Sequence, residues 1–403
     1  MSHEVVRPSW ALLGSVTALG PLAMGIHVPG IDRIAPAIGE TVMRTQLTVP
    51  AFIVAFGLGM FGAGEFVDRL GLRLALGVGL LVFIVGALLA GASAGLPVLL
   101  AGRVLMGAGA AFAIVVPRVA VATEPAQAIP GLARLAAIQS AVPAFAPLLG
   151  AALVGWVGWR ATFLIPGAAA VVLAVAATRS LPRRECASGD GIATNESSFT
   201  WLRSRDWLLP TAEIALVTAV FLVLLAQSSN LLVEPFHLGA GELGLVLGST
   251  GAAFVVGSLV VVRARDPARL QRAARAAFLG AMALIGAGGS SLAVWAIGLG
   301  VYAVANGILV PVAFGAVALA APAAKGRALG AAGALQMLIG AASGAAANAL
   351  GGLTSVTFGV AGVLVALAVL TLARSGRRSA GGRSERFETV GDVIKYIKEK
   401  SEN

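Results

Sequence analysis

Apolar stretches of similar length, separated by shorter polar segments, run through almost the whole chain. A helix of roughly 20 residues crosses a hydrocarbon core about 30 Å thick, and a helix satisfies its backbone hydrogen bonds within the segment. The pattern therefore predicts an all-α membrane protein with twelve transmembrane helices. The twelve stretches are residues 9–28, 46–66, 74–94, 97–121, 132–155, 160–178, 207–230, 243–262, 273–290, 292–320, 328–350 and 354–373.

The one long polar interval separates the first six stretches from the last six. It covers residues 179–206 and contains the single cysteine of the chain, Cys186. A polar break of this kind is typical of a linker between two parts of a chain. We expect an N-terminal six-helix half at residues 1–178, a cytoplasmic linker at 179–206 and a C-terminal six-helix half at 207–378.

The two halves show traces of an internal repeat. The segment "AIQSAVPAFAPLLGAALVG" at 137–155 aligns with "ALQMLIGAASGAAANALGG" at 334–352, which sets Gln139 opposite Gln336 and prolines opposite glycines. Duplicated helical units are common in transporters, although segments rich in alanine and glycine also align by composition alone. We interpret the match as two pseudo-symmetric six-helix bundles.

Residues 379–403 differ in composition from the rest of the chain. They hold three of its four lysines, and their apolar residues fall on one face of a short helix. The segment resembles the last helix of acyl carrier proteins, without the Asp-Ser-Leu that bears phosphopantetheine. We interpret it as an appended cytoplasmic tail; a native juxtamembrane helix is the alternative.

Charge supports the membrane assignment and orients the chain. Charged residues make up 12% of the chain, about half the share in soluble domains, and the net charge is +10. With a cytoplasmic N-terminus, most basic residues fall in the cytoplasmic loops, so both termini are expected in the cytoplasm. The cytoplasmic set is Arg7, Arg69, Arg73, Arg118, Arg134, the clusters at 179–205 and 263–275, Lys325, Arg327 and the basic residues of the tail; the other side has Arg33, Arg44 and Arg160.

This composition excludes several classes of function. A nucleic-acid-binding protein needs its basic residues on one soluble face with aromatic residues between them, and this chain lacks that pattern. The chain has three histidines and one cysteine, too few for a disulfide framework or a Cys-rich metal site. We therefore expect no catalytic residues, no metal and no cofactor.

The segment "GAGEFVDRLGLRL" at 62–74 concentrates charge between the second and third apolar stretches. Glu65, Asp68, Arg69 and Arg73 fall within nine positions. Small residues let helix ends approach closely, and a carboxylate such as Asp68 can accept hydrogen bonds from the N-terminus of a helix in the other half. A loop whose arginines only set the topology is the alternative.

The spacing of this segment resembles the loop motif of the major facilitator superfamily. The resemblance implies a latch formed by Gly64, Asp68, Arg69, Gly71 and Arg73, whose strength differs between inward-open and outward-open states. The family usually has a second basic residue directly before Arg73, where this chain has leucine.

Further motifs resemble drug:proton antiporters of the same superfamily. "RVLMGAGAA" places Arg103 in the fourth stretch, with Met106 where these antiporters usually have glutamine. "PAFAPLLG" looks like their fifth-helix motif, in which Pro143, Pro147 and Gly150 would bend the helix where the halves meet. "GWRATF" and "IHVPGIDRIAPAI" resemble the bicyclomycin- and chloramphenicol-resistance group.

The resemblance implies proton coupling, but the acid that this group usually has in the first helix is absent. Gly25 occupies its position, and His27 replaces a tyrosine. His27 and Glu213 are therefore candidates for proton coupling or substrate binding, with an interfacial role as the alternative. Arg103 is a third candidate because a buried arginine is costly in lipid; pairing with backbone carbonyls is its structural alternative.

Four amide side chains within the apolar stretches are candidates for lining a central cavity, and hydrogen bonding between helices is the alternative for each. With few charges in such a cavity, the cargo would be amphipathic, and neutral or anionic, and Arg103 could bind an acidic group. The four are Gln139, Gln227, Asn306 and Gln336.

We expect a monomeric transporter of the bacterial inner membrane that exports a small amphipathic drug or secondary metabolite by alternating access, in exchange for protons. Its partners would be the small molecule, protons and the lipid bilayer. The alternatives are export of a self-made siderophore or metabolite, uptake of a small nutrient or siderophore, and a membrane sensor that does not transport.

Overall fold

The computed structural model describes residues 9–181, 199–287, 291–350 and 353–380. Within these ranges all regular secondary structure is helical. Most of the predicted linker, residues 182–198, and the tail from residue 381 lie outside the described residues, so the expectations for them stay predictions.

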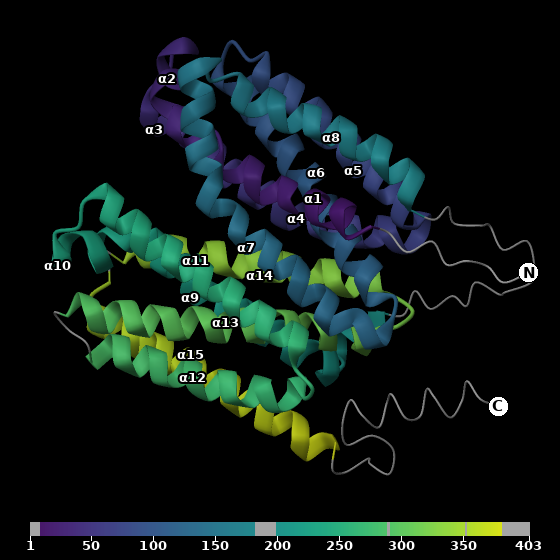
Figure 1. Ribbon diagram of the computed structural model, residues 1–403, viewed down its shortest axis with the longest axis vertical. Helices are drawn as coiled ribbons and strands as arrows, with labels where there is room; N and C mark the ends of the chain where they lie inside the picture. Colours follow the sequence, from purple (N-terminus) through teal and green to yellow (C-terminus); the bar gives the residue numbers. More distant parts are fainter. Residues whose placement is uncertain (1–8, 182–198, 288–290, 351–352, 381–403) are drawn as a thin grey trace, which may run out of the picture.

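The helices form two groups that lie one above the other in Figure 1. The N-bundle precedes the linker and contains α1 (Trp10–Gly25), α2 (Ile31–Ala37), α3 (Val42–Thr45), α4 (Thr48–Leu70), α5 (Leu72–Gly91), α6 (Leu96–Ala122), α7 (Pro125–Trp156) and α8 (Ala161–Ser180). The C-bundle follows it and contains α9 (Arg205–Ala226), α10 (Glu234–Phe236), α11 (Ala240–Arg263), α12 (Pro267–Ala287), α13 (Leu292–Ala320), α14 (Lys325–Ala349) and α15 (Ser355–Ala380).

Ten helical segments of the described residues are long and apolar enough to cross a membrane. The long helices α12 and α15 fall outside this count: α12 carries arginines in its first turns, and the apolar stretch of α15 covers only 356–370. With these two, the described part of the chain has twelve long helices, six in each bundle. The all-α prediction is confirmed, and ten of the twelve predicted spanning helices are long and apolar enough to cross a membrane within the described residues.

Local sequence sets the ends of several helices. The Ser9 hydroxyl accepts a hydrogen bond from the Leu12 N–H at the start of α1, and Ser204 does the same for Trp207 at the start of α9. These side chains satisfy N–H groups that lack a partner in the first turn. Gly71 ends α4 with a φ of +81°, a conformation that side chains with a Cβ adopt rarely.

The helices also extend beyond the predicted apolar stretches. α12 begins at Pro267 rather than 273, because its arginine-rich first turns continue the helix past the apolar part. The segment between the first two stretches, expected as a loop, contains the short helices α2 and α3. Hydropathy marks the part of a helix that lies in lipid, not its polar extensions.

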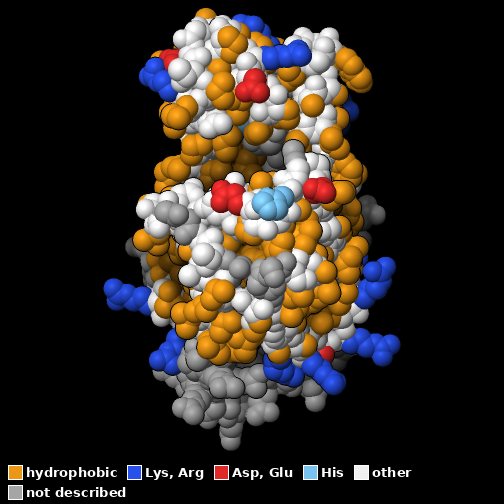
Figure 2. All heavy atoms as spheres, turned by 90° about the vertical axis from the view of Figure 1, so that its left-hand side faces the viewer, with side chains coloured by type: hydrophobic (Ala, Val, Ile, Leu, Met, Phe, Trp, Pro, Cys, Tyr) orange, Lys and Arg blue, Asp and Glu red, His pale blue; other side chains and the backbone are white. Residues whose placement is uncertain are grey.

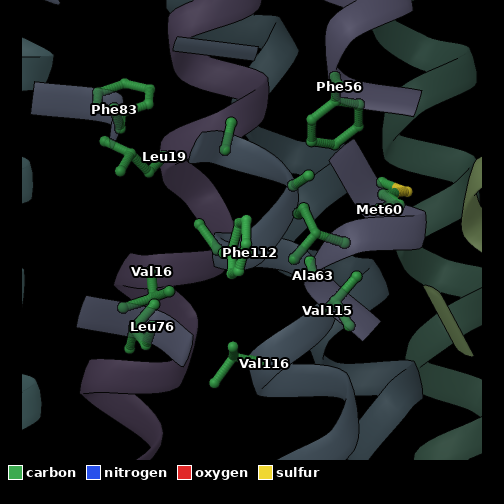
Figure 3. Close-up of a cluster of buried hydrophobic side chains, with 14 of the residues drawn as sticks. Val16, Leu19, Phe56, Met60, Ala63, Leu76, Phe83, Phe112, Val115 and Val116 are labelled. Carbon is green, nitrogen blue, oxygen red and sulfur yellow. The ribbon is translucent and has the colours of Figure 1, made fainter. Parts of the chain in front are cut away.

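Aromatic and branched side chains fill the middle of the N-bundle. Phe83, Leu19 and Phe112 meet there from three helices, and Met60 lies on the side toward the C-bundle (Figure 3). Glycines let the backbones come close: a Cβ on Gly109 would stand 2.5 Å from the carbonyl oxygen of a glycine on α5. Such small-residue contacts are the usual basis of helix packing in membranes.

The two bundles meet through few helices. α4 packs against α14, and α7 packs against α11 and α13. In Figure 1, α7, α11 and α14 accordingly lie between the two groups. α6 adds contacts with α14 and α13, and these helix pairs together determine how the bundles are held to each other.

Candidate functional site

Asp68, in the last turn of α4, joins the two bundles at one end of the molecule. Its carboxylate accepts hydrogen bonds from the backbone N–H groups of Gly326 (2.8 Å) and Arg327 (2.9 Å). Both donors belong to the first turn of α14, where N–H groups have no partner within the helix and the helix dipole favours a negative charge. A carboxylate of the N-bundle thus caps a helix of the C-bundle. We call this the latch contact, and its side of the molecule the latch end.

Charged side chains surround the latch contact. The Arg327 Nε atom is 3.4 Å from Asp68 Oδ2 and 3.7 Å from Glu65 Oε2, so this arginine also pairs across the bundles. Arg69 pairs with Glu65 at 2.5 Å within α4, and its side chain is 76% exposed, so this pair adds little. Arg73 lies half-buried in the first turn of α5.

Glycines bring α4 and α14 into backbone contact next to Asp68. A Cβ on Gly64 would overlap the carbonyl of Gly326, and a Cβ on Gly330 would overlap the carbonyl of Met60. Gly62, two residues away on the same helix, has open space where its Cβ would stand. In the last turns of α4, glycine is therefore required at Gly64, on the face that meets α14, and not at Gly62.

Further contacts between the bundles lie in the halves of the helices nearest the latch end. The Lys325 ammonium donates to the Thr123 carbonyl (3.4 Å), and a Cβ on Gly315 would meet the side chain of Ile129. A Cβ on Gly57 would meet Leu338, near the middle of α4 and α14. The bundles are thus packed together from the latch end to about the middle of these helices.

The opposite end carries α2, α3 and α10, and we call it the open end. α4 ends at the latch end and α14 begins there, so the start of α4, next to α3, and the end of α14 lie at the opposite end. Figure 2 looks at the open end and shows a hollow between the two bundles, lined largely by hydrophobic side chains. The molecule is therefore closed at one end and hollow at the other.

Arg103 lies inside the N-bundle. Its side chain is completely buried, donating from Nε to the Thr48 carbonyl (3.1 Å) and from Nη1 to the Ala23 carbonyl (3.0 Å). The guanidinium also stacks over the Phe52 ring, 4.3 Å from its centroid. All these partners belong to α1 and α4, so Arg103 ties three helices of one bundle together. This geometry favours the structural alternative over contact with a cargo between the bundles.

His27 belongs to the same buried group. Its Nε2 atom lies 3.1 Å from Thr48 Oγ1, and its ring packs 5.6 Å from that of Phe163. Its Nδ1 atom has no hydrogen-bond partner among the described residues. His27 follows the end of α1 and adjoins Arg103 through Thr48, so the structure brings these two predicted residues together.

The fifth-helix motif lies on the part of α7 toward the open end. α7 remains one helix through Pro143 and Pro147, both of which are exposed. Gly150 packs against the backbone of Ile26, where a Cβ would overlap the carbonyl oxygen. Gly150 therefore packs closely against the residue that follows α1, within the N-bundle, and the bend expected at Pro143 and Pro147 stays a prediction.

Arg118 is the functional candidate that the sequence interpretation missed. It was assigned to a cytoplasmic loop, but α6 continues to Ala122 and buries the side chain to 7% exposure. Its guanidinium carbon lies 4.1 Å from the centroid of Phe314 in the C-bundle, and its Nη2 donates to Gln139 Oε1 at 3.5 Å. The signal was available, since Arg118 falls within the apolar stretch 97–121.

The C-bundle amides make hydrogen bonds within their own bundle. Gln336 donates to Thr218 Oγ1 (2.9 Å), and Asn306 donates to the Tyr302 hydroxyl (3.3 Å). Gln227 is buried near the open end, bonded to Asn348 and to the Leu353 N–H. Gln227 therefore supports the interhelical alternative, whereas Gln336 and Asn306 each keep a buried oxygen without a partner among the described residues.

Glu213 forms an ion pair inside the C-bundle. Its carboxylate accepts from Arg275 at 2.8 and 2.7 Å and from Gln271 at 3.0 Å, which joins α9 to α12. The Glu213 side chain is 4% exposed, and that of Arg275 is 14% exposed. This bidentate pair within the C-bundle favours a structural role for Glu213, and its role in proton coupling or substrate binding stays a prediction.

Comparison with known proteins identifies the fold. The model of a family described as Major Facilitator Superfamily matches residues 13–345. Among solved structures, the human organic anion transporter MFSD10 (TETRAN) aligns with a TM-score of 0.69 and 20% identity, covering 90% of this chain and 98% of that chain. The transporter FucP in the outward conformation aligns with a TM-score of 0.70 and 16% identity, covering 90% and 97%.

Two curated proteins share part of the sequence. A "Chloramphenicol resistance protein" of Pseudomonas aeruginosa is 30% identical over 176 residues, and an "MFS-type efflux pump" of Mycolicibacterium smegmatis is 33% identical over 141 residues. The matched stretches cover 42% of the first protein and 33% of the second, and the same shares of this chain.

Proposed function

The chain belongs to the major facilitator superfamily, and we propose that it exports a small amphipathic compound by alternating access. It is a multi-pass membrane protein of a family that transports small molecules, and the prediction of the major facilitator fold is confirmed. The proposal adds a direction, a class of cargo and exchange for protons. It also places the protein in the bacterial inner membrane as a monomer, with two half-domains and both termini in the cytoplasm.

The observation that carries the proposal is the difference between the two ends of the molecule. The latch contact and the glycine contacts close one end, and the open end is hollow (Figure 2). With the basic loops in the cytoplasm, the latch end faces the cytoplasm and the cavity opens outward. A hollow between the bundles also favours a transporter over the alternative of a membrane sensor, whose centre would be filled by side chains.

The names of the curated relatives support export rather than uptake. One is named for chloramphenicol resistance and the other as an efflux pump. Chloramphenicol is therefore the first cargo to test. For proton exchange, we propose His27 as the titrating group, because an unperturbed histidine titrates near physiological pH and the Nδ1 atom of His27 has no hydrogen-bond partner among the described residues.

An efflux assay tests the proposal. In an efflux-deficient bacterial host, cells that express the protein should accumulate less chloramphenicol than cells with an empty vector, and a protonophore should abolish the difference. Higher accumulation in expressing cells would establish uptake instead. If expressing cells and empty-vector cells accumulated equal amounts of chloramphenicol, and equal amounts of each dye in an amphipathic panel, export would be contradicted.

Gly64→Ala should impair transport far more than Gly62→Ala. The added methyl group overlaps the Gly326 carbonyl, and strain of about 1–3 kcal/mol from overpacking would disfavour the closed latch end by about fivefold to a hundredfold. At Gly62 the same methyl group meets open space. Efflux rates at matched membrane expression measure the difference; equal rates for the two variants would mean that backbone contact between α4 and α14 is not needed.

A further inference from the structure

Arg118 is a buried cation at the interface of the two bundles. Its Nη2 donates to Gln139 of α7, and its Nη1 has no hydrogen-bond partner among the described residues. Nη1 lies 3.1 Å from the position that a Cβ on Gly333 of α14 would occupy. The unused donor therefore points across the interface toward the C-bundle.

The acidic side chains of the described long helices that are buried or half-buried have other partners. Glu213 is paired with Arg275, and Asp68 caps α14. No ion pair of Arg118 is present within the described residues. A buried cation without an anion is costly, and this cost falls when an anion binds beside it. The observation points to an anion that occupies the site for only part of the cycle.

One further polar side chain contacts Arg118, and another lies one turn along the C-bundle helix that Nη1 faces. Gln139 comes from the N-bundle, and Gln336 lies one turn beyond Gly333 in the C-bundle, with its Oε1 buried and without a partner among the described residues. Arg103 has no comparable setting, because its described partners all belong to the N-bundle. Among the described residues, only at Arg118 does a free cationic donor meet both bundles.

We propose that Arg118, with Gln139 and Gln336, binds the carboxylate or phosphate group of an anionic cargo. This rests on the proposed export function and names the class of cargo. Guanidinium binds such groups through two parallel N–H donors, and Nη1 is free to begin that contact.

Phe314 gives the site a way to release its ligand. In the closed arrangement, the face of this C-bundle ring lies against the Arg118 guanidinium, 4.1 Å from its carbon. The negative face of the ring is a weak substitute for an anion. When the latch end closes, Phe314 therefore competes with the cargo for Arg118; when it opens toward the cytoplasm, the guanidinium is freed to capture the next anion.

Binding to the purified full-length protein tests this site without relying on transport. Calorimetric titrations compare three carboxylates with their neutral amides: benzoate with benzamide, 1-naphthaleneacetate with its acetamide, and 1-pyrenebutyrate with its butanamide. In the pair that binds most tightly, the carboxylate should bind about tenfold tighter than the amide, as expected for a charge-assisted hydrogen bond. Arg118→Gln should bring the two affinities within about twofold of each other.

Three further variants keep the test decisive if Arg118→Gln folds poorly. Arg118→Lys should retain part of the preference for the carboxylate. Phe314→Leu should bind it at least as tightly as wild type, because the competing ring is gone. Arg44→Gln removes the same charge from an exposed pair at the open end and should change nothing.

The outcomes separate this inference from the proposed function. Equal affinity for carboxylate and amide, binding of no probe by the wild type, or an unchanged preference in Arg118→Gln would overturn the anion site. Selective binding of the carboxylate without efflux of any probe or of chloramphenicol from cells would leave the site standing and overturn export.

Discussion

Asp68→Asn should leave folding and membrane insertion intact and reduce transport to below about a tenth of the wild-type rate. The carboxylate accepts two backbone N–H groups of α14, at 2.8 and 2.9 Å. An amide can accept only one of them and turns its own N–H donors toward the other. Since a charge-assisted hydrogen bond contributes about 1.5–3 kcal/mol, the closed latch end loses enough free energy to become a minor state. Efflux at matched expression measures this.

Asp32→Asn is the matched control. Asp32 is an exposed aspartate of α2 at the open end, so the same loss of charge there should leave the rate near wild type. Well-inserted Asp68→Asn protein that transports at the wild-type rate would show that the latch contact only accompanies the closed state and does not hold it.

Arg103→Ala should destabilise the protein and abolish transport as a consequence. The truncation removes the guanidinium donors to the carbonyls of Ala23 and Thr48 and the packing on Phe52. Hydrogen bonds from a charged group contribute about 1.5–3 kcal/mol each, so the apparent melting temperature in detergent should fall by about 5 °C or more. Arg103→Lys should recover only part of the lost melting temperature, because one ammonium reaches fewer acceptors than a planar guanidinium.

The melting curve separates the two interpretations of Arg103. Loss of an architectural arginine lowers stability and transport together. If Arg103→Ala melts like the wild type but does not transport, the residue acts on cargo or protons, and a purely structural role for Arg103 is ruled out.

The fold could be predicted from the sequence because lipid leaves the backbone little choice. Each apolar stretch had to be a helix, and the polar interval at 179–206 indicated where the chain divides. A helix N-terminus in the other half was predicted as the partner of Asp68, and the structure contains that contact with α14. The identity of the helix that provides this N-terminus depends on the packing of α4 against α14, and the sequence of a single apolar stretch does not predict that packing.

The candidate site was harder to predict because burial and partners depend on tertiary packing. Arg118 was assigned to a loop since it lies near the end of its stretch, and only the contact with Phe314 shows that it is interfacial. Glu213 finds Arg275 only when α9 packs on α12. Arg103 was correctly placed inside a helix, but its carbonyl partners belong to segments far away in the chain.

Distances at both ends of the molecule test the central claim, which is that the latch end and the open end alternate in being closed. Spin labels can be placed, after Cys186→Ser, on exposed residues of the two bundles: Leu74 with Ala268 at the latch end, and Met43 with Leu350 at the open end. Double electron–electron resonance then gives both distance distributions. We predict two populations in which a longer latch-end distance accompanies a shorter open-end distance, with Asp68→Asn shifting the balance toward the opened latch end. A single latch-end distance that neither added chloramphenicol nor Asp68→Asn changes would contradict the account.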